Sequence, residues 1–476
     1  MADLHDSQQI SGEALLAQFD DAMTRYESSE AFSCGGSVAL SPSTDFGDFT
    51  SEIKPVTCPR PVIFWRSGNG VKSTTINCTW TLTRDWENSL EELVQDCAPA
   101  TFGRDDKNVF DETVRKAGVL REDLISTNFN PYDFGIIDAV ARELRPGIAR
   151  AGKQPAVERW GIVAELYQLS VYSEPSGMFK SHVDTPRGRT HFGSLVIILP
   201  TKFQGWTLPS PPMKKNTGET ANLRSGGQLK IVHRGRERIY LEQSDFWSNL
   251  IRWVAFYSDC EHEVLPVSSG HRVALTYHLY VTAHMGGLTQ PRLQNPDSKD
   301  YSVYCGIKNL LASPSFMKSG GVLGFYCSFQ YPDKVEGTYY YERRPLALKG
   351  VDAVVFAVFR VFGLTVHIKP HDWRVEVADV HTRRQILVSA ATVGGELVVH
   401  QKQLERFGRG HYVGDEIFHD ANWLNEMPRG KSAGAGYLVG AKPTQRLGNE
   451  AEVEWDYSFR ALFVVVPAFP DRVLEA

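Results

Sequence analysis

The sequence lacks the long apolar stretch that a membrane span needs. Its longest apolar run, residues 351–364, is shorter than the roughly 20 residues of a transmembrane helix and contains Asp352 and Arg360. The first residues of the chain also lack the basic and apolar regions of a signal peptide. We therefore expect no membrane partner and no secretory leader.

Cysteine is scarce and forms no motif. The seven cysteines are scattered, odd in number and include no CxxC pair. They are Cys34, Cys58, Cys78, Cys97, Cys260, Cys305 and Cys327. This pattern indicates neither a disulfide framework nor a zinc site. It favours reduced thiols, and hence a cytoplasmic or nuclear location.

An excess of charge of either sign is also missing. The formal net charge is −5 and the isoelectric point is near 6.3, and basic runs such as residues 234–238 are short. A dedicated nucleic-acid binder needs a basic surface, so we expect no nucleic-acid partner. Residues 67–72 lack the spacing of a phosphate-binding glycine loop, and no Ser-His-Asp or Cys-His nucleophile arrangement is indicated.

What the chain does contain is enough apolar sequence for a large core. Hydrophobic residues make up 42% of the 476 residues, a length that allows two or three domains. We predict a disordered start and one helix over residues 1–30. A main domain with helical support follows over residues 31–285, and a C-terminal extension over residues 286–476.

Strand periodicity dominates the middle of the chain. From Gly161 onward apolar residues recur at every second position, and further alternating segments follow. These predicted strands cover residues 195–199, 228–233, 238–242, 253–257 and 273–280. Many short strands separated by turn residues favour a jelly roll, or double-stranded β-helix. The predicted fold class is α+β, with this roll as the core.

Helices are expected on the N-terminal side of the roll. Ser11 is a suitable N-cap for a helix that reaches residue 26, and three short strands are expected between residues 32 and 82. Further helices are predicted over residues 89–97, 111–120 and 134–144. The last of these has an apolar face that can cover the outside of a sheet.

The C-terminal extension carries weaker α/β signals. The predicted elements are strands within residues 320–332, 365–370, 373–380 and 461–466 and a buried helix over residues 348–363. Residues 394–397 repeat the GGxL phrase of residues 226–229, so one interpretation of the extension is a degenerate second β-roll. We expect this part to pack against the first roll without chemistry of its own.

A polar, proline-rich insertion occupies residues 204–225. Long loops in compact domains are usually functional or disordered, so this insertion is a candidate substrate lid. A tolerated surface insertion is the alternative interpretation.

Three potential metal ligands stand in a specific order. On an extended strand His182 and Asp184 point to the same face, and His262 lies in the next suitable segment. Two imidazoles and one carboxylate form the facial triad that leaves positions open on ferrous iron. An isolated HxD tripeptide occurs by chance. The prediction of a metal site therefore depends on the order and spacing of the whole set, which includes Arg272 ten residues after His262. The alternative is two core histidines and a capping aspartate.

These segments resemble the iron(II)- and 2-oxoglutarate-dependent dioxygenases, in particular the prolyl-4-hydroxylase-like branch. The pattern of that family is filled in order by Tyr172, His182, Asp184, His262 and Arg272. The phrases YSEPSGMFKSHVDT and FYSDCEHEVLPVSSGHRVALTYHL are similar to a large uncharacterised fungal group. The resemblance covers residues 160–282 and identifies the main domain, residues 31–285, as its dioxygenase part.

The resemblance implies a role for each of these residues. His182, Asp184 and His262 would be the catalytic iron ligands, and Arg272 would pair with the distal carboxylate of 2-oxoglutarate through charge-assisted hydrogen bonds. Tyr172 would hydrogen-bond the co-substrate, although a buried structural tyrosine fits equally well. Weaker candidates near the co-substrate are Ser194 and Tyr257. The implied cofactors are Fe(II) and 2-oxoglutarate, with dioxygen as co-substrate and ascorbate as a further candidate.

The expected reaction is hydroxylation of a C–H bond, with decarboxylation of 2-oxoglutarate to succinate. The substrate would be a prolyl peptide or protein, or a small amino-acid-like molecule. Two other classes stay open: a non-catalytic β-roll that keeps its metal as a binding module, and a cupin-type iron oxygenase that does not use 2-oxoglutarate. Arg272 argues against both, because neither needs a co-substrate arginine at that spacing.

Overall fold

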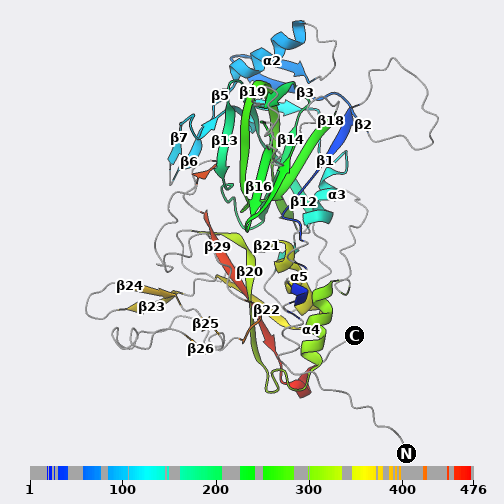
Figure 1. The fold of residues 1–476 in the computed structure, drawn as a ribbon, viewed down its shortest axis with the longest axis vertical. Coiled ribbons are helices and arrows are strands. Elements are labelled where there is room, and N and C mark those ends of the chain that lie inside the picture. The colour runs from blue at the N-terminus through cyan, green and yellow to red at the C-terminus, as the bar shows by residue number, and fades with distance from the viewer. Residues whose placement is uncertain are drawn as a thin grey trace, which may run out of the picture.

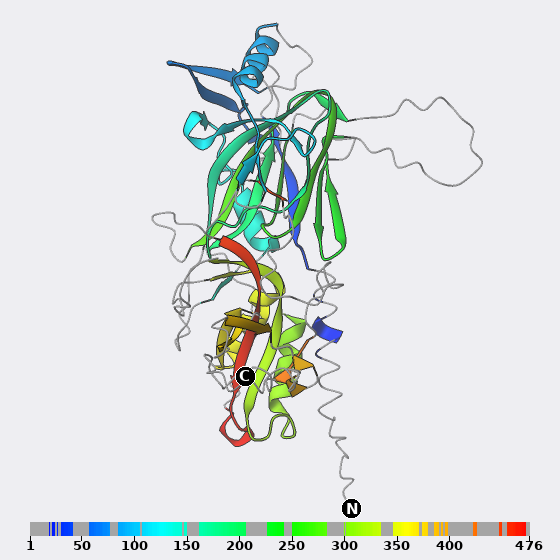
Figure 2. The ribbon, with the colours of Figure 1, turned by 90° about the vertical axis from the view of Figure 1, so that its left-hand side faces the viewer.

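The structure is a computed structural model in two lobes. The described residues between 33 and 282 form the lobe at the top of Figure 1, and those between 302 and 472 supply most of the other lobe (Figures 1 and 2). The described residues are 19, 21–23, 26, 30–40, 57–76, 84–104, 107–144, 147–149, 161–205, 226–241, 250–282, 299, 301–334, 346–370, 374–378, 385–389, 392–393, 396–397, 422–425, 447–449 and 455–472. The Ser11 cap, most of the 204–225 insertion and the glycines of the second GGxL phrase lie outside them.

One sheet system of 13 strands organises the first lobe. Its main path runs in the spatial order β2 (Thr57–Cys58), β1 (Ser33–Leu40), β18 (Leu250–Tyr257), β14 (His191–Ile198), β19 (Glu261–Thr282), β12 (Gly161–Ser173), β9 (Gly118–Arg121) and β5 (Ala98–Pro99). A second array is built on β19 from β8 (Arg115–Lys116), β13 (Gly177–His182), β15 (Phe203–Gly205), β16 (Leu229–His233) and β17 (Arg236–Tyr240). The β1–β2 pair is parallel, and the other pairs in this system are antiparallel. The predicted strand-rich, antiparallel architecture is confirmed.

A single strand, β19, belongs to both arrays. Its first part pairs with β13 and β16, and its second part pairs with β12 and β14. Gly270 lies between these two parts of β19 and has a φ of +74°, which favours glycine. A Cβ at this position would also lie only 2.3 Å from the Lys202 carbonyl oxygen. His262 was expected after one strand and Arg272 before another. The structure instead carries both residues on one continuous strand.

The central strands are buried because helices and strands cover both of their faces. β14 and β18 are rich in β-branched and aromatic residues, which favour strands, and nearly all of their side chains are buried. The helix α3 (Ile136–Leu144) packs against β1, β12 and β18, as its apolar face predicts. The helix α2 (Arg84–Asp96) confirms the second predicted helix and begins earlier than expected.

The predicted helix over residues 111–120 is wrong. This segment instead forms a turn and the strands β8 and β9, which pair with β13 and β12. A Cβ at position 118 would approach the Cys97 Cβ to 2.7 Å. A residue without a side chain, Gly118, therefore suits this position of β9. Strand pairing has overridden the helical apolar spacing of Val114 and Leu120, both of which are buried.

Small sheets complete the first lobe. One contains β10 (Ile125–Thr127), β3 (Val62–Ser67) and β4 (Gly70–Thr75), and the 3₁₀ helix η1 (Glu122–Leu124) directly precedes β10. Another contains β28 (Leu447–Gly448), β6 (Phe102–Arg104) and β7 (Lys107–Val109). The third pairs β11 (Gly147–Ala149) with β21 (Leu346–Leu348). Two of these sheets therefore join the C-terminal part of the chain to the first lobe.

The second lobe has a four-stranded sheet of its own. Its order is β22 (Thr365–Pro370), β29 (Trp455–Val466), β20 (Gly321–Lys334) and β27 (Asn422–Trp423). The helices α4 (Ser302–Ala312) and α5 (Gly350–Val361) pack on each other, and α5 contacts β20 and β22. Short pairs are formed by β23 (Arg374–Ala378) with β24 (Gln385–Ser389) and by β25 (Thr392–Val393) with β26 (Glu396–Leu397), and η5 (Phe469–Asp471) follows β29.

A buried ion pair joins the two lobes. Lys349, which is fully buried, places its Nζ 2.8 Å from Asp259 Oδ1 and donates to the Gln330 carbonyl oxygen at 3.0 Å. Asp259 Oδ2 in turn accepts a hydrogen bond from the backbone N–H of Gln330 at 2.9 Å. Both charges are therefore compensated where the lobes meet. Among the described residues, no helix is long and apolar enough to cross a membrane.

Candidate metal centre

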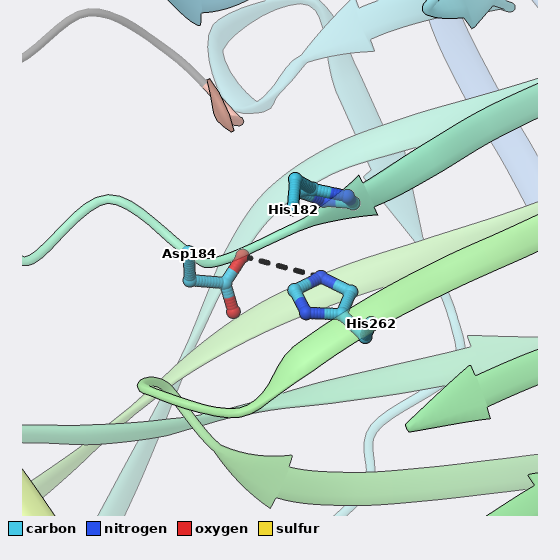
Figure 3. Close-up of side chains that lie close together, drawn as sticks. All are labelled: His182, Asp184 and His262. Atoms are coloured by element: carbon cyan, nitrogen blue, oxygen red, sulfur yellow. Dashed lines mark ion pairs between the residues drawn. The ribbon is translucent and has the colours of Figure 1, made fainter. Parts of the chain in front are cut away.

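Three buried side chains from two neighbouring strands meet inside the first lobe. His182 ends β13, Asp184 follows two residues later, and His262 is the second residue of β19. His182 and His262 are direct partners in the β13–β19 register. One ligand atom from each of the three residues lies within 4.8 Å of the others (Figure 3). The structure thus brings together the three residues that the sequence pattern selected.

Both histidines are oriented by the backbone two residues before them. The Nδ1 atom of His182 lies 2.9 Å from the Lys180 carbonyl oxygen, and that of His262 lies 3.1 Å from the Cys260 carbonyl oxygen. A carbonyl can only accept, so each Nδ1 carries a proton, and in the neutral ring this leaves the lone pair on Nε2. That tautomer is the one in which Nε2 is ready to bind a metal ion.

Aromatic rings restrict the two imidazoles further. The Phe179 ring stacks on His182 with the ring centroids 3.5 Å apart, and the Phe256 ring lies 4.5 Å from that of His262. Burial lowers the pKa of His182 well below its usual value, and the neighbouring His262 adds to this effect. His182 is therefore neutral at physiological pH, which is the protonation state of a metal ligand.

The carboxylate of Asp184 is held by one donor on each oxygen. The Ser194 hydroxyl donates to Oδ2 at 2.5 Å, and the Asn449 amide nitrogen donates to Oδ1 at 3.1 Å. Oδ1 also faces the centre, 3.7 Å from His262 Nε2. Ser194, a weak co-substrate candidate in the sequence, thus lies beside Asp184 and orients it.

Asn449 is a site residue that sequence reasoning missed. It lies 265 residues after Asp184, in the part of the chain that we expected to contribute no chemistry. The sequence around it, Gly448 to Glu450, contains no recognisable motif. No signal in the sequence links it to the centre, because its position depends on the pairing of β28 with β6.

A cavity extends from the triad into the sheet system. The space between its lining residues is about 510 Å³, open solvent at the mouth included. Beside the triad, its polar lining residues are Arg115, Tyr167, Gln168, Ser170, Tyr172, Ser194, Arg272, Thr276 and Asn449. Apolar lining residues, among them Phe179, Phe256 and Val264, surround the metal side of the cavity. A small polar molecule bound in this cavity would therefore meet charged and polar side chains next to the metal ligands.

Arg272 is a buried cation in this cavity. Only 1% of the residue is exposed, and its Nε and Nη2 have no hydrogen-bond partner within the described part of the chain. Burial lowers its pKa to about 10, so the guanidinium stays charged at neutral pH. A buried charge without a partner is costly, and a bound anion would remove that cost.

The two tyrosine candidates have different surroundings. Tyr172 lies directly opposite Arg272 in the β12–β19 register, and the guanidinium carbon is 5.3 Å from the centre of its ring. Tyr172 also lines the cavity. Tyr257 does not line it: its hydroxyl donates to the Leu144 carbonyl and accepts the Gly350 amide at 3.0 Å. The structure therefore places Tyr257 between α3 and α5, away from the co-substrate position expected for it.

Comparisons with known proteins find likeness to solved structures alone. No protein-family model and no curated protein matches the chain. A prolyl hydroxylase from Trichoplax adhaerens, solved in complex with a peptide fragment of hypoxia inducible factor, is 14% identical, with 40% of this chain and 74% of that chain covered and a TM-score of 0.23. A prolyl-4-hydroxylase from Pseudomonas putida is 18% identical, with 41% and 82% covered and a TM-score of 0.22. A 2OG-Fe(II) oxygenase family oxidoreductase from Burkholderia pseudomallei is 11% identical, with 44% and 84% covered and a TM-score of 0.21.

Proposed function

We propose that the protein is a non-haem Fe(II)- and 2-oxoglutarate-dependent dioxygenase. The observation that carries this proposal is the combination of a buried His-Asp-His triad with an unpaired buried arginine in the same cavity. A triad alone can hold a structural metal ion, and a buried arginine alone can bind many kinds of anion. Together they supply a metal site and an anion site in the lining of one cavity.

The donor set fits ferrous iron. His182 and His262 would bind through Nε2 and Asp184 through its carboxylate, which is the facial triad of non-haem iron oxygenases. The ion would supply a Lewis-acidic centre with open positions for the co-substrate and dioxygen. The chain supplies the orientation: two backbone carbonyls fix the imidazoles, and Ser194 and Asn449 fix the carboxylate.

Arg272 would hold the distal carboxylate of 2-oxoglutarate. Its guanidinium is the shape and charge that a carboxylate binds through two parallel hydrogen bonds. Tyr172 packs against that guanidinium and restricts its position. A purely structural metal centre has no use for a second, uncompensated buried charge in the cavity, so this arginine favours an enzyme over an inert module.

The fold that we propose for this centre is a double-stranded β-helix. The support comes from β19, which pairs in turn with β13 and β16 and then with β12 and β14. Strands of both arrays contribute residues to the lining of the cavity. The apolar residues Phe179, Phe256 and Val264 line that space and would exclude water from the reacting atoms.

The proposed reaction is hydroxylation of a substrate C–H bond, with conversion of 2-oxoglutarate to succinate and carbon dioxide. The proposed substrates are a prolyl residue of a peptide or protein, or a small amino-acid-like molecule. This part of the proposal rests on the sequence resemblance of residues 160–282.

Succinate formation tests the proposal directly. Protein loaded with Fe(II) under anaerobic conditions is mixed with 2-oxoglutarate and pools of peptides and amino acids, and succinate is measured after air is admitted. We expect turnover in the wild type, no turnover in His182→Ala, and a raised 2-oxoglutarate requirement in Arg272→Ala. His271→Ala is the matched control, because His271 bonds Ser173 and Glu91 instead of facing the cavity. Iron binding without succinate from any pool would favour the binding module or the 2-oxoglutarate-independent oxygenase.

A further inference from the structure

The C-terminal part of the chain reaches the metal centre through a three-residue segment. Residues 447 and 448 form β28 and pair with Arg104 and Gly103 of β6, and Gly448 also forms a bridge with Val183. In Figure 1 this segment is the small red strand beside β6. Because Val183 lies between His182 and Asp184, the next residue of the segment, Asn449, is placed directly against the ligand residues.

Both the nitrogen and the oxygen of the Asn449 side-chain amide form hydrogen bonds at the centre. Its Nδ2 donates to Asp184 Oδ1 at 3.1 Å, and its Oδ1 accepts the Thr185 backbone amide at 2.9 Å. The residue is 6% exposed. A flipped amide would place an oxygen against the carboxylate and an NH₂ against an N–H group, so this orientation is the one that the surrounding groups select.

A chain of contacts through Arg115 and Phe179 connects the same segment to His182. Arg115 donates through Nη1 to the Asn449 carbonyl oxygen at 3.3 Å and to the Thr101 carbonyl oxygen at 2.6 Å. Its guanidinium carbon lies 4.5 Å from the centre of the Phe179 ring, which stacks on His182. The segment therefore contacts Asp184 directly and is connected to His182 only through Arg115 and Phe179.

We propose that Asn449 is a positioning residue for the metal ligand Asp184, and that docking of residues 447–449 and metal binding stabilise each other. The inference rests on the proposed metal centre and adds to it a dependence on the C-terminal part of the chain. Without Asn449, one carboxylate oxygen of Asp184 keeps the Ser194 hydrogen bond and the other loses its donor. Since the coupling between two binding events is reciprocal, a change that undocks the segment weakens the metal, and metal binding tightens the segment.

The test measures Co(II) binding, which needs neither substrate nor turnover. Calorimetric titration gives the affinity, and visible absorption at saturating Co(II) reports the ligand geometry. Groups that orient a metal ligand typically contribute about 10- to 100-fold to metal affinity, so we expect a loss in that range for Asn449→Ala, together with a changed absorption spectrum. Ser194→Ala, which removes the other donor to Asp184, should change affinity in the same direction.

Asn425→Ala is the matched control. Asn425 lies in the second lobe, and its side-chain amide also makes two hydrogen bonds, both to the backbone of Tyr326. Its removal should lower thermal stability and leave Co(II) affinity and spectrum unchanged. A purely structural role of Asn449 would give the same result as this control.

A second readout follows the segment itself. In hydrogen exchange, Co(II) should increase protection of the backbone around residues 447–449 in the wild type and not in His182→Ala. Asn449→Asp serves if Asn449→Ala does not fold, because it keeps an acceptor for the Thr185 amide and loses the donor to Asp184. Its Co(II) spectrum should differ from that of the wild type.

The outcomes separate the two proposals. If the wild type binds Co(II) and the Asn449 variants match it in affinity and spectrum, the positioning role is overturned while the metal centre stands. If the wild type binds Co(II) no better than His182→Ala, the proposed metal centre itself is overturned, and the role of Asn449 with it.

Discussion

Two buried cations in this protein have opposite surroundings. Lys349, at the contact between the lobes, bonds Asp259, the Gln330 carbonyl and the Ser258 hydroxyl. Arg272, in the cavity, has two guanidinium nitrogens without a partner in the part of the chain that the structure describes. A buried charge is tolerated when it is paired, so Lys349 is stable as it stands. The unpaired charge of Arg272 indicates a position that a ligand completes.

The largest effect is expected when the buried ion pair between Lys349 and Asp259 is broken. Lys349→Met keeps most of the side-chain volume and leaves Asp259 buried without its cation. We expect a loss of about 3–5 kcal/mol in the free energy of unfolding, measured with denaturant. The double variant Lys349→Met with Asp259→Leu should lose less, because no uncompensated charge stays buried. A loss below about 1 kcal/mol in the single variant would show that the pair does not hold the lobes together.

The second largest effect is expected when the unpaired cation, Arg272, is removed. Arg272→Met should leave the free energy of unfolding of the ligand-free protein unchanged or higher, because an unpaired buried charge is removed. The free energy of 2-oxoglutarate binding to the metal-loaded protein should become less favourable by about 2–3 kcal/mol, which is the contribution of charge-assisted hydrogen bonds. Calorimetry under anaerobic conditions measures this, with His271→Ala as the unaffected control. Strong destabilisation without loss of 2-oxoglutarate affinity would mean that Arg272 is structural.

Per pH unit, the smallest effect is a pH dependence of the free energy of unfolding that arises from further buried ionisable groups. Burial lowers the pKa of His191 to about 3 and of His233 to about 4, and lowers that of His278. Their stabilising contributions are complete above pH 6.5 and are lost as the pH falls, because the unfolded histidines then take up protons. Burial raises the pKa of Asp352 to about 7, so its contribution runs the other way and is lost as the pH rises from about 4 to 7.

Asp352→Asn removes this opposing contribution. Between pH 4 and 6.5 the free energy of unfolding of the variant should rise with pH more steeply than that of the wild type, by about 1.4 kcal/mol per pH unit. Denaturant unfolding of the metal-free protein at several pH values measures both slopes. Equal slopes would show that Asp352 is ionised in the folded protein throughout this range.

Strand periodicity predicted the first lobe better than helical periodicity did. The alternating segments around β12, β14, β16, β17 and β18 are strands, since in antiparallel sheets the side-chain period of two is set by the backbone itself. Residues 111–120 show the opposite case, because apolar spacing that suits a helix was overridden by pairing with β13 and β12. The helix α4 was not predicted at all; its buried face packs against α5, and its Tyr304 stacks on Phe362 at the end of that helix.

Local sequence determined the ligand set of the candidate centre. His182 and Asp184 are two residues apart, and His262 and Arg272 lie on one strand, so backbone geometry alone sets the spacing within each pair. Only the tertiary structure decided which groups surround them. Tyr257 was excluded from the cavity by its contacts with α3 and α5, and Asn449 was included by a strand pair between residues more than 300 positions apart, Leu447 with Arg104. Contacts of that kind depend on chain folding over long separations, and no periodicity or spacing in the sequence encodes them.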